Sequence, residues 1–200
     1  MVISLASLSL AACGTSGRTL QDPEPNATAP ARKNSGSTAP PNTAAGGTIA
    51  GPQINSTGLL LQTTAWRSGQ SIPTPYTCDG VNTSPSFTIG GVPAGTVELV
   101  LVVSNQNVAN QTLWLLAGIS PATRTLPQGG VPTGAIQITN SSGTPRWSGP
   151  CPTSGTNTYE FALYALSSPS GLTTSATLAD VDAAIANSTT ASVINGTYSR

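Results

Sequence analysis

Residues Tyr159–Leu166 read YEFALYAL, and residues Val97–Val103 read VELVLVV. Both segments carry apolar side chains at odd and at even positions, so both faces of an extended chain would be apolar. A strand with two apolar faces is buried on both sides, which is the situation of a central strand in a covered sheet. These two segments therefore predict the central strands of a mostly β domain.

Further apolar runs of strand length surround this pair, and turn signals such as Gly90-Gly91 and Gly129-Gly130 separate them. The runs are Leu59–Thr63, Phe87–Ile89, Leu113–Ile119, Ala135–Ile138 and Ser192–Tyr198. They predict that the domain occupies residues 58–200 and that a strand closes it near the C-terminal end.

One segment of this domain has a helical period. Thr177 and Asp180 have the spacing of a capping box. Leu178, Val181 and Ile185 follow at helical spacing. The sequence thus predicts a helix near the C-terminal end, before the last strand.

The charge and histidine content excludes several classes of function. The 200 residues include seven basic and seven acidic side chains and no histidine. Because no basic cluster occurs, the electrostatic footprint of nucleic-acid binding is missing, and we expect no nucleic-acid partner. Without histidine there is no Ser-His or Cys-His pair and no histidine ligand for a metal. The lone lysine, Lys33, lies in a Pro/Ser-rich stretch, which argues against a Ser-Lys dyad.

The carboxylates do not indicate an active site either. Asp180 and Asp182 are two residues apart on the predicted helix and point to different faces. Asp79, Glu98 and Glu160 are scattered along the chain, and Glu160 is interpreted as an outward residue of its strand. We interpret each carboxylate as a surface or capping residue. We therefore expect no enzyme activity, no catalytic residue and no cofactor.

The first 13 residues predict a lipoprotein signal. The apolar run from Val2 to Leu10 is too short to span a bilayer, which takes about 20 residues. It ends in Leu-Ala-Ala-Cys13, which resembles a bacterial lipobox, although no Lys or Arg precedes the run. That signal implies a diacylglyceryl group and acyl chains such as palmitate on Cys13, and an exported protein anchored to the outer face of the membrane. The alternative is an apolar N-terminus with a chance cysteine.

Residues 14–57 predict a flexible tether. Their large aliphatic side chains are only Leu20, Ile49 and Ile54, and six prolines interrupt any periodicity. Such a segment cannot bury enough apolar surface to offset its chain entropy. A flexible chain of this length reaches roughly 35–40 Å.

The cysteine count predicts a disulfide. If Cys13 carries the lipid, Cys78 and Cys151 remain as one pair in an exported domain. A disulfide between them would close a long loop and contribute roughly 4 kcal/mol in the chain-entropy account. The alternative is two buried free thiols. Two distant cysteines without histidine do not predict a zinc site.

An ordered set of motifs in residues 58–200 resembles a known family. The set consists of Ile72-Pro73, Tyr76 to Gly80 (YTCDG), Ser84-Pro85, Gly91 to Thr96 (GVPAGT), Leu113 to Leu116 (LWLL), Leu126-Pro127, Gly149 to Pro152 (GPCP), Tyr159–Leu166 and Gly196 to Arg200 (GTYSR). It resembles the phosphatidylethanolamine-binding protein family, and more closely its bacterial Raf-kinase-inhibitor-like branch. The resemblance implies that family's β-sheet sandwich with one or two short peripheral helices.

The resemblance also implies a small-anion pocket, built from four sequence blocks at one end of the sheets. In this chain the Asp-Pro-Asp-Ala-Pro block reads NQNVA, so two amides replace two carboxylates. Leucine replaces the histidine of the His-Trp block, and asparagine replaces the histidine of the His-x-Tyr block, whereas Gly-Pro-Cys-Pro is retained. The candidate pocket residues are Asn105, Asn107, Leu113, Trp114, Gly149, Pro150, Asn157 and Tyr159.

These replacements change the expected ligand. Neutral hydrogen bonds are about half as strong as charge-assisted ones, so we expect weak binding of phosphate. Core packing explains Trp114 and Tyr159 at least as well as ligand contact does. We expect a non-catalytic, membrane-anchored lipoprotein that binds a small neutral or weakly polar ligand, or a protein partner, through a histidine-free pocket. The alternatives are an inhibitor of extracellular proteases or kinases that acts through its surface, and a scaffold whose site has decayed.

Overall fold

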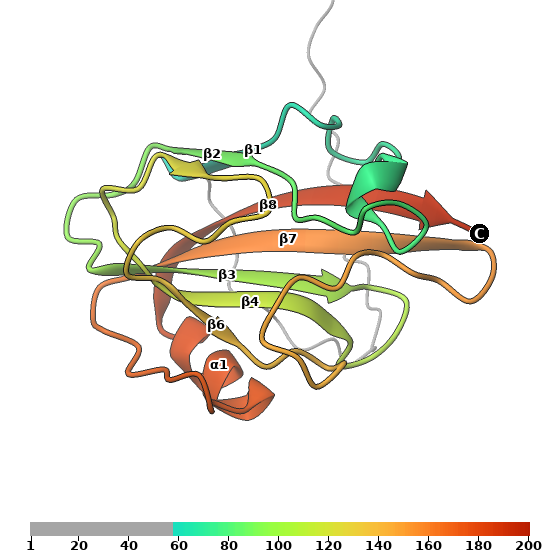
Figure 1. The fold of residues 1–200 in the computed structure, drawn as a ribbon. Coiled ribbons are helices and arrows are strands. Elements are labelled where there is room, and N and C mark those ends of the chain that lie inside the picture. Colours follow the sequence, from blue (N-terminus) through green and yellow to red (C-terminus); the bar gives the residue numbers. More distant parts are fainter. Residues whose placement is uncertain (1–57) are drawn as a thin grey trace, which may run out of the picture. The chain divides into compact units, whose positions relative to one another are not determined.

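Strand β7 (Thr156–Leu166) is the central element of residues 58–200, which are the part of the chain that the computed structural model describes. It forms antiparallel pairs with β3 (Glu98–Asn105) on one edge and with β8 (Ser188–Ser199) on the other. With β4 (Thr112–Ile119) and β6 (Ile136–Ile138), these strands form a five-stranded sheet in the order β6-β4-β3-β7-β8 (Figure 1). The predictions for the signal, for Cys13 and for the tether lie outside the described residues.

A smaller sheet lies over one face of the larger one, and the α-helix lies on the other face (Figure 1). The strands of the smaller sheet are β1 (Leu60–Gln62), β2 (Phe87–Gly90) and β5 (Thr125–Leu126), in the order β1-β2-β5. The helix α1 covers Leu178–Ile185, and a short 3-10 turn, η1, covers Thr74–Tyr76. The predicted class, a mostly β sandwich with one or two short helices, is confirmed. In residues 58–200, no helix is both long and apolar enough to cross a membrane.

Each face of the five-stranded sheet has its own hydrophobic core. Between the two sheets, Leu99, Leu101 and Phe161 pack against Phe87 and Ile89 of the smaller sheet. The opposite face packs against α1 through a second set of buried residues, namely Val100, Leu115, Ala117, Ile138, Leu166 and Val181. This two-sided burial is the reason why the central strands carry apolar side chains at both odd and even positions.

The helix begins at the predicted capping box. The Thr177 hydroxyl accepts a hydrogen bond from the Asp180 N–H at 3.2 Å, and the Asp180 carboxylate accepts one from the Thr177 N–H at 2.8 Å. Val181 is fully buried against the sheet, while Leu178 and Ile185 are half-buried beside it. The cap and the apolar spacing together place α1 on this face.

All seven predicted strands are present, with different ends. Strand β8 begins at Ser188, four residues before the predicted Ser192, because Ser188, Thr189 and Thr190 extend the strand beside β7 without showing an apolar pattern. Strand β5 was not predicted, since two residues are too few to show a period. The predicted disulfide between Cys78 and Cys151 is present, with a Cα–Cα distance of 5.4 Å.

The interpretation of Glu98 as a surface or capping residue is wrong. Its side chain is buried at the start of β3. One carboxylate oxygen accepts the Gly118 N–H at 2.7 Å and the Ser170 hydroxyl at 2.8 Å, and the other accepts the Ser170 N–H at 2.7 Å. Glu98 therefore joins β3 to β4 and to the loop between β7 and α1, with protein donors in place of water.

The variant Glu98→Gln tests this role. It turns one acceptor oxygen into a donor that faces other donors, so we expect it to lower the free energy of unfolding by about 1–3 kcal/mol. Urea unfolding followed by tryptophan fluorescence measures the change. Glu160→Gln is the matched control, because that carboxylate is half-buried without a hydrogen bond from the described residues, so this variant should not lower the free energy of unfolding. Equal stability of Glu98→Gln and the wild-type protein would contradict the assigned role.

Candidate functional site

Two asparagines tie the end of β3 to the start of β7. Asn105 lies opposite Tyr159 in the sheet, and its amide nitrogen donates to Gln111 Oε1 at 2.6 Å. Its amide oxygen accepts the Asn107 N–H at 2.9 Å, as in an Asx turn. Asn107 Oδ1 in turn accepts the Thr158 N–H at 2.7 Å. Three of the four polar side-chain atoms of these two amides are thus engaged inside the protein.

Tyr159 has a buried hydroxyl group without a hydrogen-bond partner in the described part of the chain. The whole residue is only 1% exposed. Burial raises the pKa of the Tyr159 phenol, and the Asn157 side chain and the Cys151 backbone partly offset this rise. Neither of these two groups reaches hydrogen-bond geometry, so the hydroxyl is left without a partner among the described residues.

Leu113, at the position where the resemblance implies a histidine, is buried in the core between the sheets. It is the additional residue of a β-bulge, because Val103 pairs with Trp114 and Ser104 pairs with Thr112. The carbonyl of Leu113 accepts the Ser148 N–H at 3.1 Å. This bond brings the Gly-Pro-Cys-Pro block to the start of β4.

Gly149 and Pro150 hold this block next to the disulfide. The Gly149 N–H donates to Asn82 Oδ1 at 2.8 Å, and the Cys78 N–H donates to the Pro150 carbonyl at 3.2 Å. A Cβ atom on Gly149 would lie only 2.5 Å from Asn82 Oδ1 and from the Tyr76 carbonyl. Glycine is therefore required at this position for the close packing of the loop.

Seven of the eight predicted pocket residues belong to chain segments that these contacts join. We call them the Tyr159 cluster: Asn105, Asn107, Leu113, Gly149, Pro150, Asn157 and Tyr159. Trp114 has a different setting. Its indole N–H donates to Gln137 Oε1 at 2.7 Å, and its ring packs edge-to-face on Trp147. It lines a cavity of about 210 Å³ with Arg146, whereas Asn105 borders another cavity of about 330 Å³ near α1.

An ion pair beside the Tyr159 cluster was not predicted. Arg200 Nη2 lies 2.7 Å from Asp79 Oδ1, and the Tyr198 hydroxyl donates to Asp79 Oδ2 at 2.7 Å. Arg200 also donates to Cys151 Sγ at 3.4 Å, which places its charge next to the disulfide. The sequence contained a sign of this ion pair, because Asp79 and Arg200 both lie in motifs of the family resemblance, and Asp79 directly follows Cys78. Asp79 neutralises this cation, so the cluster keeps a neutral character.

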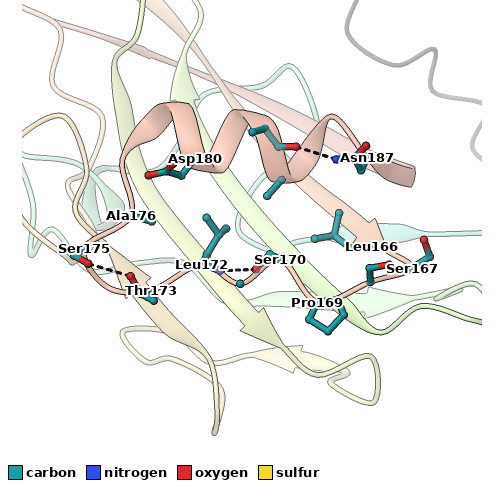
Figure 2. Close-up of a pocket in the computed structure, with 14 residues that line it drawn as sticks. Leu166, Ser167, Pro169, Ser170, Leu172, Thr173, Ser175, Ala176, Asp180 and Asn187 are labelled. Carbon is teal, nitrogen blue, oxygen red and sulfur yellow. Dashed lines mark hydrogen bonds between the residues drawn. The ribbon is translucent and has the colours of Figure 1, made fainter.

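Figure 2 shows a cavity of about 710 Å³ that contains none of the eight predicted residues. The loop after β7 and one side of α1 form its walls, with hydroxyl groups from residues such as Ser167, Thr173 and Ser175. Thr173 and Ser175 are hydrogen-bonded to each other, and Ser170 is bonded to Glu98. The hydroxyls around this cavity therefore largely serve the loop itself.

The family assignment rests on a sequence match over nearly the whole domain. A sequence model described as phosphatidylethanolamine-binding protein matches residues 62–199. The chain belongs to the phosphatidylethanolamine-binding protein family. Among solved structures, CT736 of Chlamydia trachomatis superposes with a TM-score of 0.68 at 27% identity, covering 72% of this chain and 99% of that one. E. coli YbcL gives a TM-score of 0.67 at 26% identity, with the same coverage.

Curated relatives carry general names. A UPF0098 protein of Methanothermobacter thermautotrophicus is 37% identical over 130 residues, which are 62% of this chain and 86% of the relative. A Mycobacterium tuberculosis protein named "Putative lipoprotein LppC" is 35% identical over 123 residues, 58% of this chain and 61% of the relative. The mycobacterial UPF0098 protein Rv1910c is 37% identical over 112 residues, and the chain spans about half its length.

In this phosphatidylethanolamine-binding family member, two carboxylates that were not predicted to lie together are close to one tyrosine. Glu160 and Asp182 border the 330 Å³ cavity together with Tyr164. Burial raises the pKa of the Tyr164 phenol, and the negative charges of Glu160 and Asp182 raise it further. Glu160 is half-buried, which corrects its interpretation as an outward residue, and burial raises the pKa of its carboxyl group. Within residues 58–200, no three His, Cys, Asp or Glu side chains are grouped so that they could hold a metal ion.

The raised pKa of Glu160 predicts how stability depends on pH. The folded protein binds this proton more tightly than the unfolded chain, so stability rises as the pH falls through the folded pKa toward the ordinary value of 4.5. Glu160→Gln should therefore raise the free energy of unfolding at pH 7 and flatten its dependence between pH 7 and pH 4. Urea unfolding over that pH range measures both effects.

Asp180→Asn is the control variant, because the pKa of Asp180 is shifted in the opposite direction to that of Glu160. Hydrogen bonds from Thr177 lower the pKa of the Asp180 carboxyl, so this group stabilises the fold above its unfolded pKa, and the stabilisation is lost as the pH falls through the folded value. Asp180→Asn should therefore reduce stability at neutral pH. A Glu160→Gln variant that is also less stable at neutral pH would contradict the burial argument.

Proposed function

We propose that the domain binds a small, neutral polar ligand at the Tyr159 cluster. The observation that supports this proposal is the buried Tyr159 hydroxyl without a partner. An unsatisfied buried polar group costs about 1–3 kcal/mol, and such exceptions call for a specific reason, such as a bound molecule. A ligand reaches the hydroxyl by displacing the half-buried Asn157 side chain, whose amide then offers a second neutral donor.

The charges around the cluster support a neutral ligand over phosphate. Arg200, the cation that touches Cys151, is already paired with Asp79. Leu113, Asn157 and Tyr159 supply apolar contact and neutral hydrogen bonds only. An anion bound here would lose its hydration without a charge-assisted donor in return.

The variant Tyr159→Phe separates a binding role from a packing role. Removing an unpartnered hydroxyl should leave the stability of the empty domain equal or slightly higher. Native mass spectrometry of protein purified from its own membranes should find a small bound molecule on the wild-type protein and none on Tyr159→Phe. Tyr198→Phe is the matched control, because it removes a hydrogen-bonded hydroxyl outside the cluster and should keep the bound molecule.

Two results would contradict ligand binding at Tyr159. One is an empty wild-type protein that phosphate, phosphoethanolamine and glycerol all fail to stabilise against heat. The other is a bound molecule that survives Tyr159→Phe. A shift in melting temperature with phosphate alone would contradict the neutral character of the ligand.

We further propose that the protein is a non-catalytic lipoprotein, exported and anchored by a lipid on Cys13. The lipobox around Cys13 supports the anchor, and a relative that is 35% identical carries the name of a lipoprotein. The disulfide between Cys78 and Cys151 is favoured in an oxidising compartment outside the cytosol. In this proposal residues 14–57 join the lipid to the binding domain of residues 58–200.

Mass spectrometry of the N-terminus tests the anchor. Membrane-extracted protein should begin at Cys13 and carry a diacylglyceryl group and acyl chains, because two or more chains hold a protein stably at a bilayer. Cys13→Ser should abolish the modification and move the protein out of the membrane fraction. An unmodified Cys13 or an intact Met1 in the membrane fraction would contradict the lipid anchor.

A further inference from the structure

Strand β8 forms one edge of the five-stranded sheet, and other described residues cover only part of its outer side. Near its C-terminal end, the Gly69 N–H donates to the Asn195 carbonyl at 2.9 Å, and the Ile72 N–H donates to the Thr197 carbonyl at 2.7 Å. These bonds come from the segment after β1. They show that the backbone groups of Asn195 and Thr197 point away from β7.

The same alternation identifies the part of this edge that has no backbone partners among the described residues. In an antiparallel pair, every second residue directs its N–H and C=O to the same side of the strand. The pairing of β8 with β7 continues without a shift from Thr197 back to Thr190, so Ala191 and Val193 also direct these groups outward. Among the described residues, the outward groups of Ala191 and Val193 have no backbone partner. Ala191 is only 3% exposed, so Val193, which is half-buried, is the accessible position of this edge.

A groove of about 780 Å³ lies beside this part of the edge. Residues of β1 and the segment Ser192 to Ile194 line it, and the Leu61 N–H donates to the Ser192 hydroxyl at 2.9 Å where the two strands meet. Leu60, a large apolar side chain that is 48% exposed, lines this groove. An unpaired backbone edge beside an apolar wall is what an added strand requires.

The chain enters the described domain at this groove. Gly58 directly precedes Leu59 in the groove wall and has a φ of +122°, a conformation that favours glycine. Three residues separate Gly58 from Leu61, which limits the distance to about 10 Å. The residues just before Gly58 are therefore within reach of the open edge. Two of the three large aliphatic side chains of residues 14–57, Ile49 and Ile54, lie in this stretch.

We propose that residues 48–57 dock on the outer edge of β8 as an added strand. Residues 53–55 pair with the backbone of Val193, and Ile54 lies against the apolar wall at Leu60. The open edge is too short to hold a separate peptide tightly, whereas an attached segment has an effective concentration in the millimolar range. Docking also covers an edge that would otherwise pair with other chains. The flexible part of the tether then ends near residue 47, and its reach falls to roughly 30–35 Å.

Amide hydrogen exchange of the detergent-solubilised full chain, resolved by NMR, tests this docking. The Val193 N–H should be protected to a degree similar to the Thr197 N–H, which donates to the Gln70 carbonyl at 3.0 Å. Ile54→Asp removes the apolar anchor and should lower the protection of Val193 at least tenfold, leaving Thr197 unchanged. Leu20→Asp makes the same chemical change elsewhere in the tether and should have no effect.

Three results would overturn the proposal. The first is a Val193 N–H that exchanges at the rate of an unprotected amide in the wild-type chain. The second is protection of Val193 that Ile54→Asp leaves intact. The third is protection that grows with protein concentration, because a second copy would then occupy the edge. None of these results depends on the ligand at Tyr159, so the two proposals are tested separately.

Discussion

Strand β7 is hydrogen-bonded on both edges and buried on both faces, and the positions of the side chains of the candidate site depend on this constraint. Alternation along the strand directs Tyr159 and Phe161 into the core between the sheets. The same alternation directs Glu160 and Tyr164 toward α1. A shift of one residue in the pairing would exchange these two sets, so the register of β7 also places the Tyr159 and Glu160 side chains on opposite faces of the sheet.

The sequence predicted those parts of the fold that depend on local pattern. Apolar residues at both odd and even positions identified β3 and β7, and the spacing of Thr177 and Asp180 identified the start of α1. The burial of Glu98 could not be predicted, because its partners Gly118 and Ser170 are 20 and 72 residues away. Glu160 and Asp182 come close only through the packing of α1, which no local spacing encodes.

The candidate site was located by its sequence blocks, but the use of each side chain was not. The replacement of carboxylates by Asn105 and Asn107 looked like a loss of ionic groups. In the structure, the Asn105 amide nitrogen donates to Gln111, which an ionised carboxylate cannot do. The amides thus stabilise the turn that ends β3. Tyr159 kept its buried position without a partner, and only the three-dimensional contacts reveal this.

The edge strand β8 has a consequence for the time course of synthesis. Its contacts with the first strand and the loop behind it join residues 131 and 129 positions apart, as in the bonds from Leu61 to Ser192 and from Trp66 to Asn195. At a ribosomal rate of about 5–20 residues per second, these partners emerge roughly 6–26 s apart. Until β8 emerges, β1 lacks these partners, and β7, once made, lacks a neighbour on one edge, so the sandwich cannot close. The sandwich of residues 58–200 therefore cannot be completed before β8 has been made.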